Sequence, residues 1–254
     1  EAGKFEAFRA AGVNRLSIGI QSFSDDRLKR LGRIHSVSEA RETIRCARDI
    51  FENFNLDLMY ALPGETMAGL REELDEAAES GAAHLSCYQL TIEPGTAFAK
   101  HLPEELPDAD QTAEMGDFVE SFLAEKGFGR YEVSGYAKPG RRCRHNLNYW
   151  TFGDYIAAGA GAHGKVSTRE GIRREMRFMN PRQYLEALRE GRCAAADIHR
   201  VSSEDLPFEF MLNALRLLEG VPECTFSERT GLPLDAIAPT LQDLSARGLI
   251  AGEP

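Results

Sequence analysis

The sequence lacks the features that mark several large classes of protein. Its five cysteines are odd in number and scattered along 254 residues, and no two of them form a C-x-x-C pair. This argues against a disulfide framework and against a zinc or cluster motif, and it favours the ordinary thiols of a cytoplasmic protein. No apolar run approaches the roughly 20 residues that span a bilayer, and no charged-then-apolar leader opens the chain.

Positive charge is also scarce, because 30 Lys and Arg residues face 40 Asp and Glu residues, for a formal net charge of -10. Proteins that bind nucleic acid without reading its sequence neutralise phosphates with Lys and Arg. Residues 227–247 do resemble a helix-turn-helix or winged-helix module, but its second helix carries Asp235, Asp243 and only Arg247 as a base. DNA-reading helices are basic, so we interpret this region as a structural cap and expect no nucleic-acid partner.

The first half of the sequence alternates between strand and helix patterns. Apolar, partly β-branched runs predict buried strands at residues 15–22, 55–62 and 84–92. Helical spacing predicts helices at residues 5–11, 25–31, 38–51 and 67–80, with Ser38 as the N-cap of the third. This alternation predicts an α/β fold with a parallel sheet, in which sites form at the carboxyl ends of the strands. The polar residues on or near that rim are Gln21, Asp57, Tyr60 and Thr91.

The rest of the chain is predicted to contain a helix at residues 110–126, a strand at 130–137 and an irregular loop at 141–150. The character of the sequence changes after residue 198, where helical patterns follow one another to the end. We therefore predict two domains, residues 1–198 and residues 199–254, the second mostly helical and resembling a winged helix.

Asp57 is a carboxylate inside a strand that otherwise has the composition of a core. A buried carboxylate needs partners. Either Arg33 and Gln21 supply them, or all three side chains face a bound ligand, and the residues alone leave the choice open.

A glycine pattern at residues 159–164 matches G-x-G-x-x-G. A dinucleotide site also needs a helix that opens on the glycines, and residues 165–175 are polar, without an apolar helical stripe. A tight strand end, where small residues allow close approach, is the better interpretation.

The loop at residues 141–150 combines a histidine with arginines and aromatics. Its notable members are Arg141, Arg142, Arg144, His145, Asn146, Tyr149 and Trp150, the only tryptophan of the chain. An imidazole can ligate heme iron, aromatic rings can pack on a porphyrin face, and arginines can pair with propionates. The alternative is that the loop merely packs over the rest of the fold, with His145 bonded to backbone.

Several segments together resemble one family, the coproporphyrinogen-oxidase-like radical-SAM proteins. The similar segments are residues 12–23, 31–35, 55–64, 88–94 and 208–213. Residues 145–150 match H-N-x-x-Y-W, the motif that separates the heme chaperones of this family from its true oxidases. The resemblance covers essentially the whole chain.

This resemblance implies an incomplete (β/α) radical-SAM barrel that binds a 4Fe–4S cluster and S-adenosylmethionine (SAM). Gln21, Arg33 and Asp57 match SAM-contact positions of the related oxidases, whereas Thr91 and His163 match further positions only weakly, because the residue types differ. The heme motif would comprise His145, Asn146, Tyr149 and Trp150, with His145 as the ligand of the heme iron.

The sequence departs from the family in one respect, because the C-x-x-x-C-x-x-C loop that holds the cluster is absent. The chain as given should therefore not cleave SAM. We expect the natural protein to continue upstream of Glu1, with that triplet roughly one hundred residues earlier, an estimate from the missing β/α units.

The resemblance implies a protein that binds heme or porphyrin and delivers heme to respiratory hemoproteins, with peripheral membrane association. The competing function is an oxygen-independent coproporphyrinogen III oxidase, which the H-N-x-x-Y-W match disfavours. Whether the protein is an enzyme, which hemoprotein receives its heme and how many copies assemble stay open.

Overall fold

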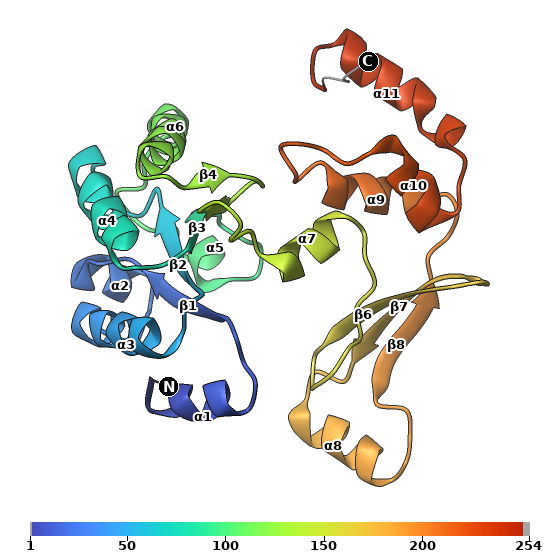
Figure 1. Ribbon diagram of the computed structural model, residues 1–254, viewed down its shortest axis with the longest axis horizontal. Coiled ribbons are helices and arrows are strands. Elements are labelled where there is room, and N and C mark those ends of the chain that lie inside the picture. The colour runs from blue at the N-terminus through green and yellow to red at the C-terminus, as the bar shows by residue number, and fades with distance from the viewer. Residues whose placement is uncertain (1, 251–254) are drawn as a thin grey trace. The chain divides into compact units, whose positions relative to one another are not determined.

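The computed structural model describes residues 2–250, which form two compact units that divide between Cys143 and Arg144 (Figure 1). The predicted boundary between residues 198 and 199 is not where the compact units separate, because it falls inside β8 (Ala195–Arg200). One buried cluster joins residues on both sides of it, including Ile172 before it and Phe210 after it. The strands before residue 198 therefore pack with the helices after it.

The first unit contains the predicted parallel sheet. β1 (Leu16–Gln21), β2 (Phe54–Tyr60) and β3 (His84–Gln89) are parallel, as predicted, and the sheet order is β1-β2-β3-β5-β4. The single strand predicted at residues 130–137 is wrong: β4 (Gly129–Arg130) and β5 (Gly135–Ala137) form an antiparallel hairpin. The chain turns there because the Tyr131 amide donates to the Gly135 carbonyl at 3.1 Å.

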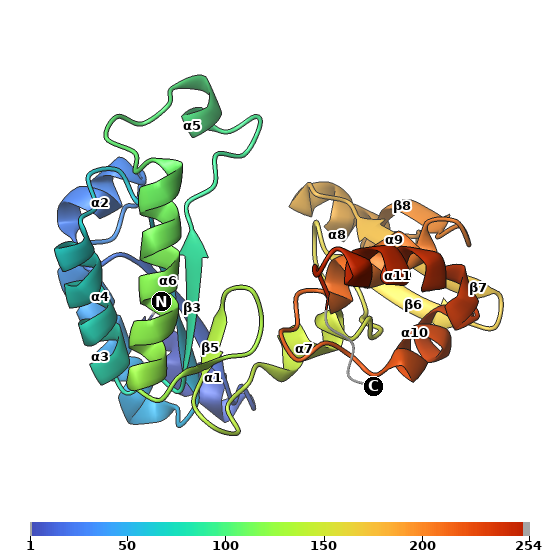
Figure 2. The ribbon, with the colours of Figure 1, turned by 90° about the horizontal axis from the view of Figure 1, so that it is seen from above.

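Helices cover one side of this sheet, where α3, α4 and α6 lie side by side in Figure 2. The N-cap of α3 is Ser36 rather than the predicted Ser38, because Ser36 and Glu39 form a reciprocal capping box. The helices of this unit are η1 (Ala2–Lys4), α1 (Phe5–Ala10), α2 (Asp25–Arg30), α3 (Val37–Ile50), α4 (Met67–Glu79), α5 (Ala97–Lys100) and α6 (Ala109–Glu125).

The alternation of side chains along the strands gives the sheet two unlike faces. Leu56 and Leu85 are fully buried in the core that the helices share. Their sequence neighbours Asn55, Asp57 and His84 point to the opposite face, which is polar. The helical side thus supplies the hydrophobic stabilisation, and the polar side carries the side chains that could contact a ligand.

The second unit contains a three-stranded antiparallel sheet that the sequence analysis did not predict. Its strands are β6 (His163–Thr168), β7 (Gly171–Arg177) and β8, in that order. Residues 144–150, predicted as a loop, form a helix, α7 (Arg144–Trp150). The other helices are α8 (Pro181–Arg189), α9 (Leu206–Ala214), α10 (Glu223–Thr230), η2 (Leu234–Ala236) and α11 (Ala238–Ala246).

The glycine pattern at residues 159–164 lies where the chain enters β6. Gly159 and Gly161 have φ angles of 103° and 73°, in the region that favours glycine. β6 continues into the β6–β7 hairpin, and no helix opens on the glycines. The glycines therefore form a tight strand end, as predicted, and not the strand–glycine–helix arrangement of a dinucleotide fingerprint. Across the described residues, no helix is both long and apolar enough to cross a membrane.

Candidate functional site

Asp57 lies on the polar face of the first sheet, but its partners differ from those predicted. The Asn55 side-chain amide donates to Asp57 Oδ1 at 2.7 Å, and the Ser17 hydroxyl donates to Oδ2 at 3.2 Å. Among the described residues, neither Arg33 nor Gln21 forms a hydrogen bond or an ion pair with this carboxylate. Since the partners are a neighbour two residues away and a side chain on the adjacent strand, Asp57 is held by the sheet itself.

Gln21 ends β1 in a strained conformation. Its φ angle is 71°, and the pairing of β1 with β2 shifts by one residue between Gly19 and Gln21. The side chain folds back over Gly19, where an added Cβ would lie 2.8 Å from Gln21 Nε2. A non-glycine residue at positive φ beside a bulge is a common feature of functional sites. Gln21 is the last residue of β1 and thus lies at the carboxyl end of that strand, as predicted.

Arg33 is exposed in the connection between α2 and α3. That connection returns to the carboxyl end of β1, because the His35 ring nitrogen Nε2 contacts the Ile20 carbonyl at 3.1 Å. Arg33 and Gln21 therefore share one end of the sheet. Asp57 lies on the polar face, slightly before this end of the sheet. In the pairing of β1 with β2 it is opposite Gly19, whereas Gln21 is opposite Leu58.

The other two predicted rim residues, Tyr60 and Thr91, end or follow their strands at the predicted end of the sheet, whereas the weak SAM candidate His163 belongs to the second unit. Thr91 follows the end of β3, exposed, with its hydroxyl on the Gln89 carbonyl at 3.3 Å. Tyr60 belongs to the helical side, where its hydroxyl would lie 3.3 Å from a Cβ placed on Gly116 of α6. His163 starts β6 in the second unit and is exposed.

A chain of buried polar groups runs from Asp57 across the sheet, and sequence reasoning missed it. His84 Nδ1 lies 2.6 Å from Asn55 Oδ1, and His84 Nε2 lies 2.9 Å from the Tyr131 hydroxyl. The Cys143 backbone amide donates to the same hydroxyl at 3.2 Å. Burial, and secondarily the charge of Arg15, lower the pKa of His84 to about 3, so this imidazole is neutral at physiological pH.

Two buried carboxylates fix the segment that follows β1. Glu73 accepts hydrogen bonds from the Ser22 hydroxyl at 2.5 Å and from the Phe23 amide at 3.0 Å. Glu65 accepts from the Leu62 amide at 3.1 Å, and the Arg27 guanidinium lies 3.4 Å from both carboxylates. Burial raises the pKa of Glu65 to about 7 and also raises the pKa of Glu73. The end of β1 is thereby held against α4.

In the second unit, the H-N-x-x-Y-W residues form an aromatic cluster on α7. The rings of His145 and Tyr149 meet edge to face with centroids 4.6 Å apart, and Tyr149 meets Tyr155 in the same way at 4.5 Å. His145 is exposed, and its ring makes no hydrogen bond within the described part of the chain. Trp150 is half-buried beneath the Arg216 guanidinium at 4.3 Å, and its indole Nε1 is buried without a hydrogen-bond partner. Asn146 is half-buried on the same helix.

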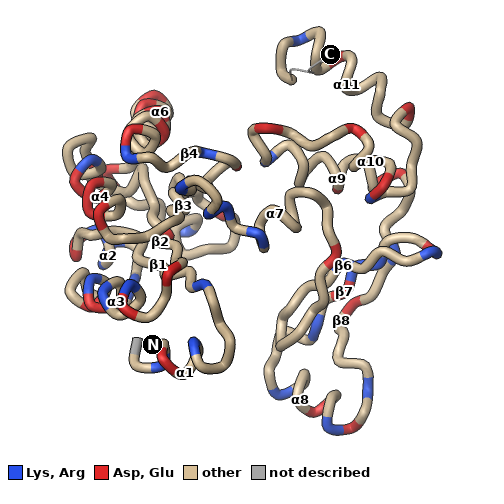
Figure 3. Tube along the Cα trace, viewed as in Figure 1, with Lys and Arg blue, Asp and Glu red and all other residues tan. Residues whose placement is uncertain are grey.

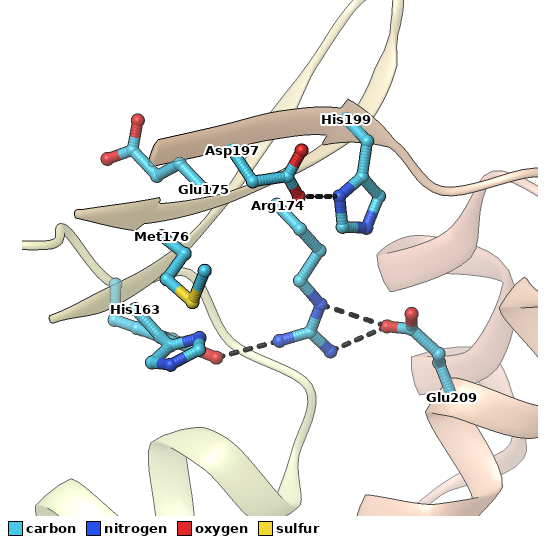
Figure 4. Close-up of a pocket in the computed structure, with 8 residues that line it drawn as sticks. His163, Arg174, Glu175, Met176, Asp197, His199 and Glu209 are labelled. Atoms are coloured by element: carbon cyan, nitrogen blue, oxygen red, sulfur yellow. Dashed lines mark hydrogen bonds and ion pairs between the residues drawn. The ribbon is translucent and has the colours of Figure 1, made fainter. Parts of the chain in front are cut away.

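A cavity of about 410 Å³ adjoins this cluster, because Tyr155 lines it. Arg174 crosses the cavity, donating to the Tyr155 hydroxyl at 2.7 Å and to Glu209 at 2.5 and 3.0 Å (Figure 4). His163 and Met176 are paired on neighbouring strands beside it. The full lining is Tyr155, His163, Arg174, Glu175, Met176, Asp197, His199 and Glu209. The lining combines two imidazoles and a thioether with three carboxylates, and its one guanidinium, Arg174, is already paired with Glu209.

Lys165 fixes the segment that follows α7. Only 1% of its side chain is exposed, and its ammonium donates to the Phe152 carbonyl and to Asp154 Oδ1, each at 2.9 Å. Burial lowers the pKa of Lys165, and the ion pair with Asp154 opposes that shift. The same ammonium lies 4.1 Å from the centroid of the Phe152 ring. These contacts hold Phe152 at a φ of 55° directly after the motif helix.

The cysteines do not fit an iron–sulfur cluster. All five are free, Cys87 and Cys143 are buried, and Cys46 is half-buried. Within residues 2–250, no group of three or more His, Cys, Asp or Glu side chains is placed to hold a metal. A cluster of the kind implied by the resemblance cannot draw its ligands from this part of the protein.

Family models, relatives in sequence and a solved structure all indicate the same family. Residues 2–77 match the model of the radical SAM superfamily, and residues 201–253 match that of the HemN C-terminal domain. The chain is 44% identical to the heme chaperone HemW of Escherichia coli strain K12, covering 98% of this chain and 65% of that protein. For HemW of Bacillus subtilis strain 168 the identity is 38%, covering 98% and 66%. The chain thus spans about two thirds of the length of these curated relatives.

A solved structure of coproporphyrinogen III oxidase (HemN) from Escherichia coli, a radical SAM enzyme, superposes with a TM-score of 0.77. It covers 98% of this chain and 60% of that one at 20% identity, which is evidence for the fold alone. The fold is therefore that of the radical SAM proteins. The chain belongs to the coproporphyrinogen-oxidase-like family of that superfamily.

Proposed function

We propose that this chain is part of a protein that binds heme and passes it to hemoproteins of respiration. The observation that carries the proposal is the α7 cluster, in which an exposed His145 is backed by the rings of Tyr149 and Tyr155. The relatives named heme chaperones span 98% of the chain and support the same reading.

The chemistry of the cluster fits heme. A neutral, exposed imidazole is a good ligand for heme iron. The edge-to-face contact with Tyr149 orients the ring while leaving it open to solvent. The adjoining cavity offers the Met176 thioether to apolar porphyrin and imidazoles to its polar edge. The exposed Arg144 on the same helix would offset the propionate charges, which otherwise meet an acidic protein.

The proposal extends to SAM, which would contact the polar face of the first sheet. Asp57 offers a carboxylate to a ligand that carries two positive groups, a sulfonium and an ammonium. Gln21 and Arg33, at the carboxyl ends of the strands, would contact the same molecule. Thr91 and His163 are the weaker candidates, because neither belongs to this face among the described residues. The cluster that would act on SAM takes its cysteines from elsewhere in the protein.

We further propose that the protein works in the cytoplasm, with peripheral contact to the membrane in which respiratory hemoproteins reside. A carrier must release its cargo. An exposed single ligand on a surface helix suits transfer better than a buried heme pocket would, because its iron–imidazole bond is open to an incoming ligand.

The test is a heme titration of the full-length protein followed by the Soret band. His145→Ala is expected to weaken binding at least about tenfold and to shift the spectrum, since an axial ligand is lost. His101→Ala, which removes an exposed histidine of the first unit, is the matched control and should behave as wild type.

Three results would change the assignment. Equal affinity and spectrum in His145→Ala would remove His145 as the ligand. Retained heme with a shifted spectrum would point to His163 or His199 in the adjoining cavity. If the wild-type protein binds no heme and, with its cluster in place, decarboxylates coproporphyrinogen III, it is an oxidase instead.

A further inference from the structure

A chain of hydrogen bonds leads from Asp57 to the backbone of Cys143, and the proton of each bond can be assigned to one of its two atoms. Its members, in spatial order, are Asp57, Asn55, His84, Tyr131 and the backbone amide of Cys143. The side chains of Asn55, His84 and Tyr131 are each at most 1% exposed. Water therefore does not compete for these hydrogen bonds.

The assignment starts from the two ends. An ionised carboxylate only accepts, so the Asn55 atom 2.7 Å from Asp57 Oδ1 is the amide nitrogen, and Asn55 Oδ1 faces His84. At the other end, a backbone amide only donates, so the Tyr131 oxygen accepts from Cys143. Both termini are thus fixed by chemistry and not by the choice of amide orientation.

The middle of the chain follows. Since Asn55 Oδ1 accepts, His84 Nδ1 carries the proton. A neutral imidazole then has an unprotonated Nε2, which accepts from the Tyr131 hydroxyl. The low pKa of His84 agrees with this neutral Nδ1–H form. All four donors point the same way, toward Asp57.

We propose that Asn55, His84 and Tyr131 are positioning residues that orient Asp57 for a cationic ligand. The inference rests on the proposed contact of Asp57 with SAM. Aligned hydrogen bonds polarise one another, so each donor strengthens the next. Asn55 fixes Oδ1, while Oδ2 has only the longer bond from Ser17, and Asp57 is only half-buried. The carboxylate is thereby held in one orientation before the ligand arrives.

The Ser86 hydroxyl completes the arrangement. It donates to Asn55 Oδ1 at 3.1 Å, and Asn55 Nδ2 also donates to Ser17 at 2.7 Å. Each hydrogen-bonding atom of the Asn55 side chain therefore has two partners, and the amide cannot rotate without losing them. Asn55 is the residue through which β1 and β3 jointly control Asp57.

Full-length protein carrying its cluster is titrated with SAM in a calorimeter, comparing three variants with wild type. Asp57→Asn tests the ligand site itself. Tyr131→Phe removes one hydroxyl from the far end of the chain and is expected to weaken SAM binding about threefold. Tyr136→Phe is the matched control, because Tyr136 is 4% exposed and its hydroxyl makes no hydrogen bond within residues 2–250. Tyr136→Phe should leave the SAM affinity unchanged, even if it lowers the midpoint of thermal unfolding as much as Tyr131→Phe does.

A second measurement is independent of SAM. Nitrogen-15 NMR of His84 should show a proton on Nδ1 and none on Nε2 from pH 5 to 8, with the Nε2 signal moved in Tyr131→Phe. The opposite tautomer would overturn the proton order and the proposal. If Asp57→Asn weakens SAM binding and Tyr131→Phe does not, the SAM site stands and the positioning role falls. If Asp57→Asn has no effect, the proposed SAM site fails, and the positioning role for SAM fails with it.

Discussion

The two sheets of this chain are stabilised in different ways. In the first, every second residue of β2 and β3 enters a core shared with helices, and Leu56 and Leu85 are fully buried. In the second, β8 is exposed along nearly its whole length, and β7 carries three arginines and a glutamate (Figure 3). Hydrophobic burial stabilises the first sheet, whereas the second depends more on specific polar contacts such as those of Arg174 and Lys165.

This contrast matters for function. A sheet that is anchored on one face by helices can carry a polar chain on the other without losing its shape. A sheet with little buried area is stable only where each polar contact is made. We therefore expect the two units to respond differently to substitutions, and the following predictions test that expectation.

The largest effect is expected in the first core. Leu56→Ala should lower the free energy of unfolding by about 3 kcal/mol, because it removes fully buried methyl groups and leaves a cavity. Ile198→Ala on β8, where the side chain is 47% exposed, should change it by less than about 0.5 kcal/mol. Urea unfolding followed by circular dichroism measures both. Similar losses would show that the second sheet is also held by burial.

The next effect depends on pH and concerns Glu65. Its carboxyl is buried and its pKa in the folded state is about 7, above the ordinary value of 4.5. Between these values the folded state binds the proton more tightly, so this group's contribution to stability is lost as the pH rises through about 7. Glu65→Gln cannot titrate. Its stability relative to wild type should therefore rise by about 2 kcal/mol between pH 5 and pH 8.

Glu65→Gln has to be compared with wild type because His84 changes the stability with pH in the opposite direction. The pKa of His84 is depressed to about 3, so its contribution is lost as the pH falls below about 6.5. Both proteins contain His84, and the difference between them isolates Glu65. A pH-independent difference would mean that Glu65 is ionised in the folded state, with Arg27 as its partner.

A third effect concerns the polar contacts of the second unit. Lys165→Met should lower the free energy of unfolding by about 1.5 kcal/mol, because the buried Phe152 carbonyl loses its donor. Trp150, the only tryptophan, lies two residues before Phe152, so its fluorescence should also change. Lys138→Met is the control, since Lys138 lies 5.0 Å over the Phe128 ring in the first unit. Unchanged fluorescence and stability would show that the Lys165 contacts do not support α7.

The smallest change in stability is expected for Gly19→Ala. The added methyl group would meet only the flexible end of Gln21, at 2.8 Å, so unfolding should change by less than about 0.5 kcal/mol. The Gln21 side chain must move, and SAM affinity should fall. Gly129→Ala is the control, because its nearest neighbour would be the Ala137 carbonyl at 3.9 Å. Full SAM affinity in Gly19→Ala would remove Gln21 from the proposed site.

The sequence was informative where burial creates a pattern. β1, β2 and β3, and the helices between them, are apolar at regular spacing, and all were predicted. β7, with the sequence GIRREMR, and β8, with AADIHR, have no such pattern, and both were missed. The motif helix α7 was missed because seven residues rich in polar and aromatic types have no apolar stripe.

The site was predictable only in part. The positions of Gln21 and Arg33 at one end of the sheet followed from the order of strands and connections. The partners of Asp57 did not, because they depend on the register of β1, β2 and β3. A signal was present: polar residues alternate with apolar ones at positions 55, 57, 84 and 86, within strands that otherwise read as core. Such alternation on adjacent parallel strands indicates a polar face, and His84 could have been found that way.

The burial of Lys165 has a practical consequence for labelling chemistry. Amine-reactive reagents modify exposed lysines within the folded state, but an ammonium held between a carbonyl and a carboxylate at 1% exposure is out of their reach. Modification at this position would then occur only while the segment after α7 is open. The rate of Lys165 modification, measured by mass spectrometry of the peptides, would report how often this segment opens. Because the heme motif ends two residues before Phe152, a slower rate with heme present would report cargo at that helix without any chromophore.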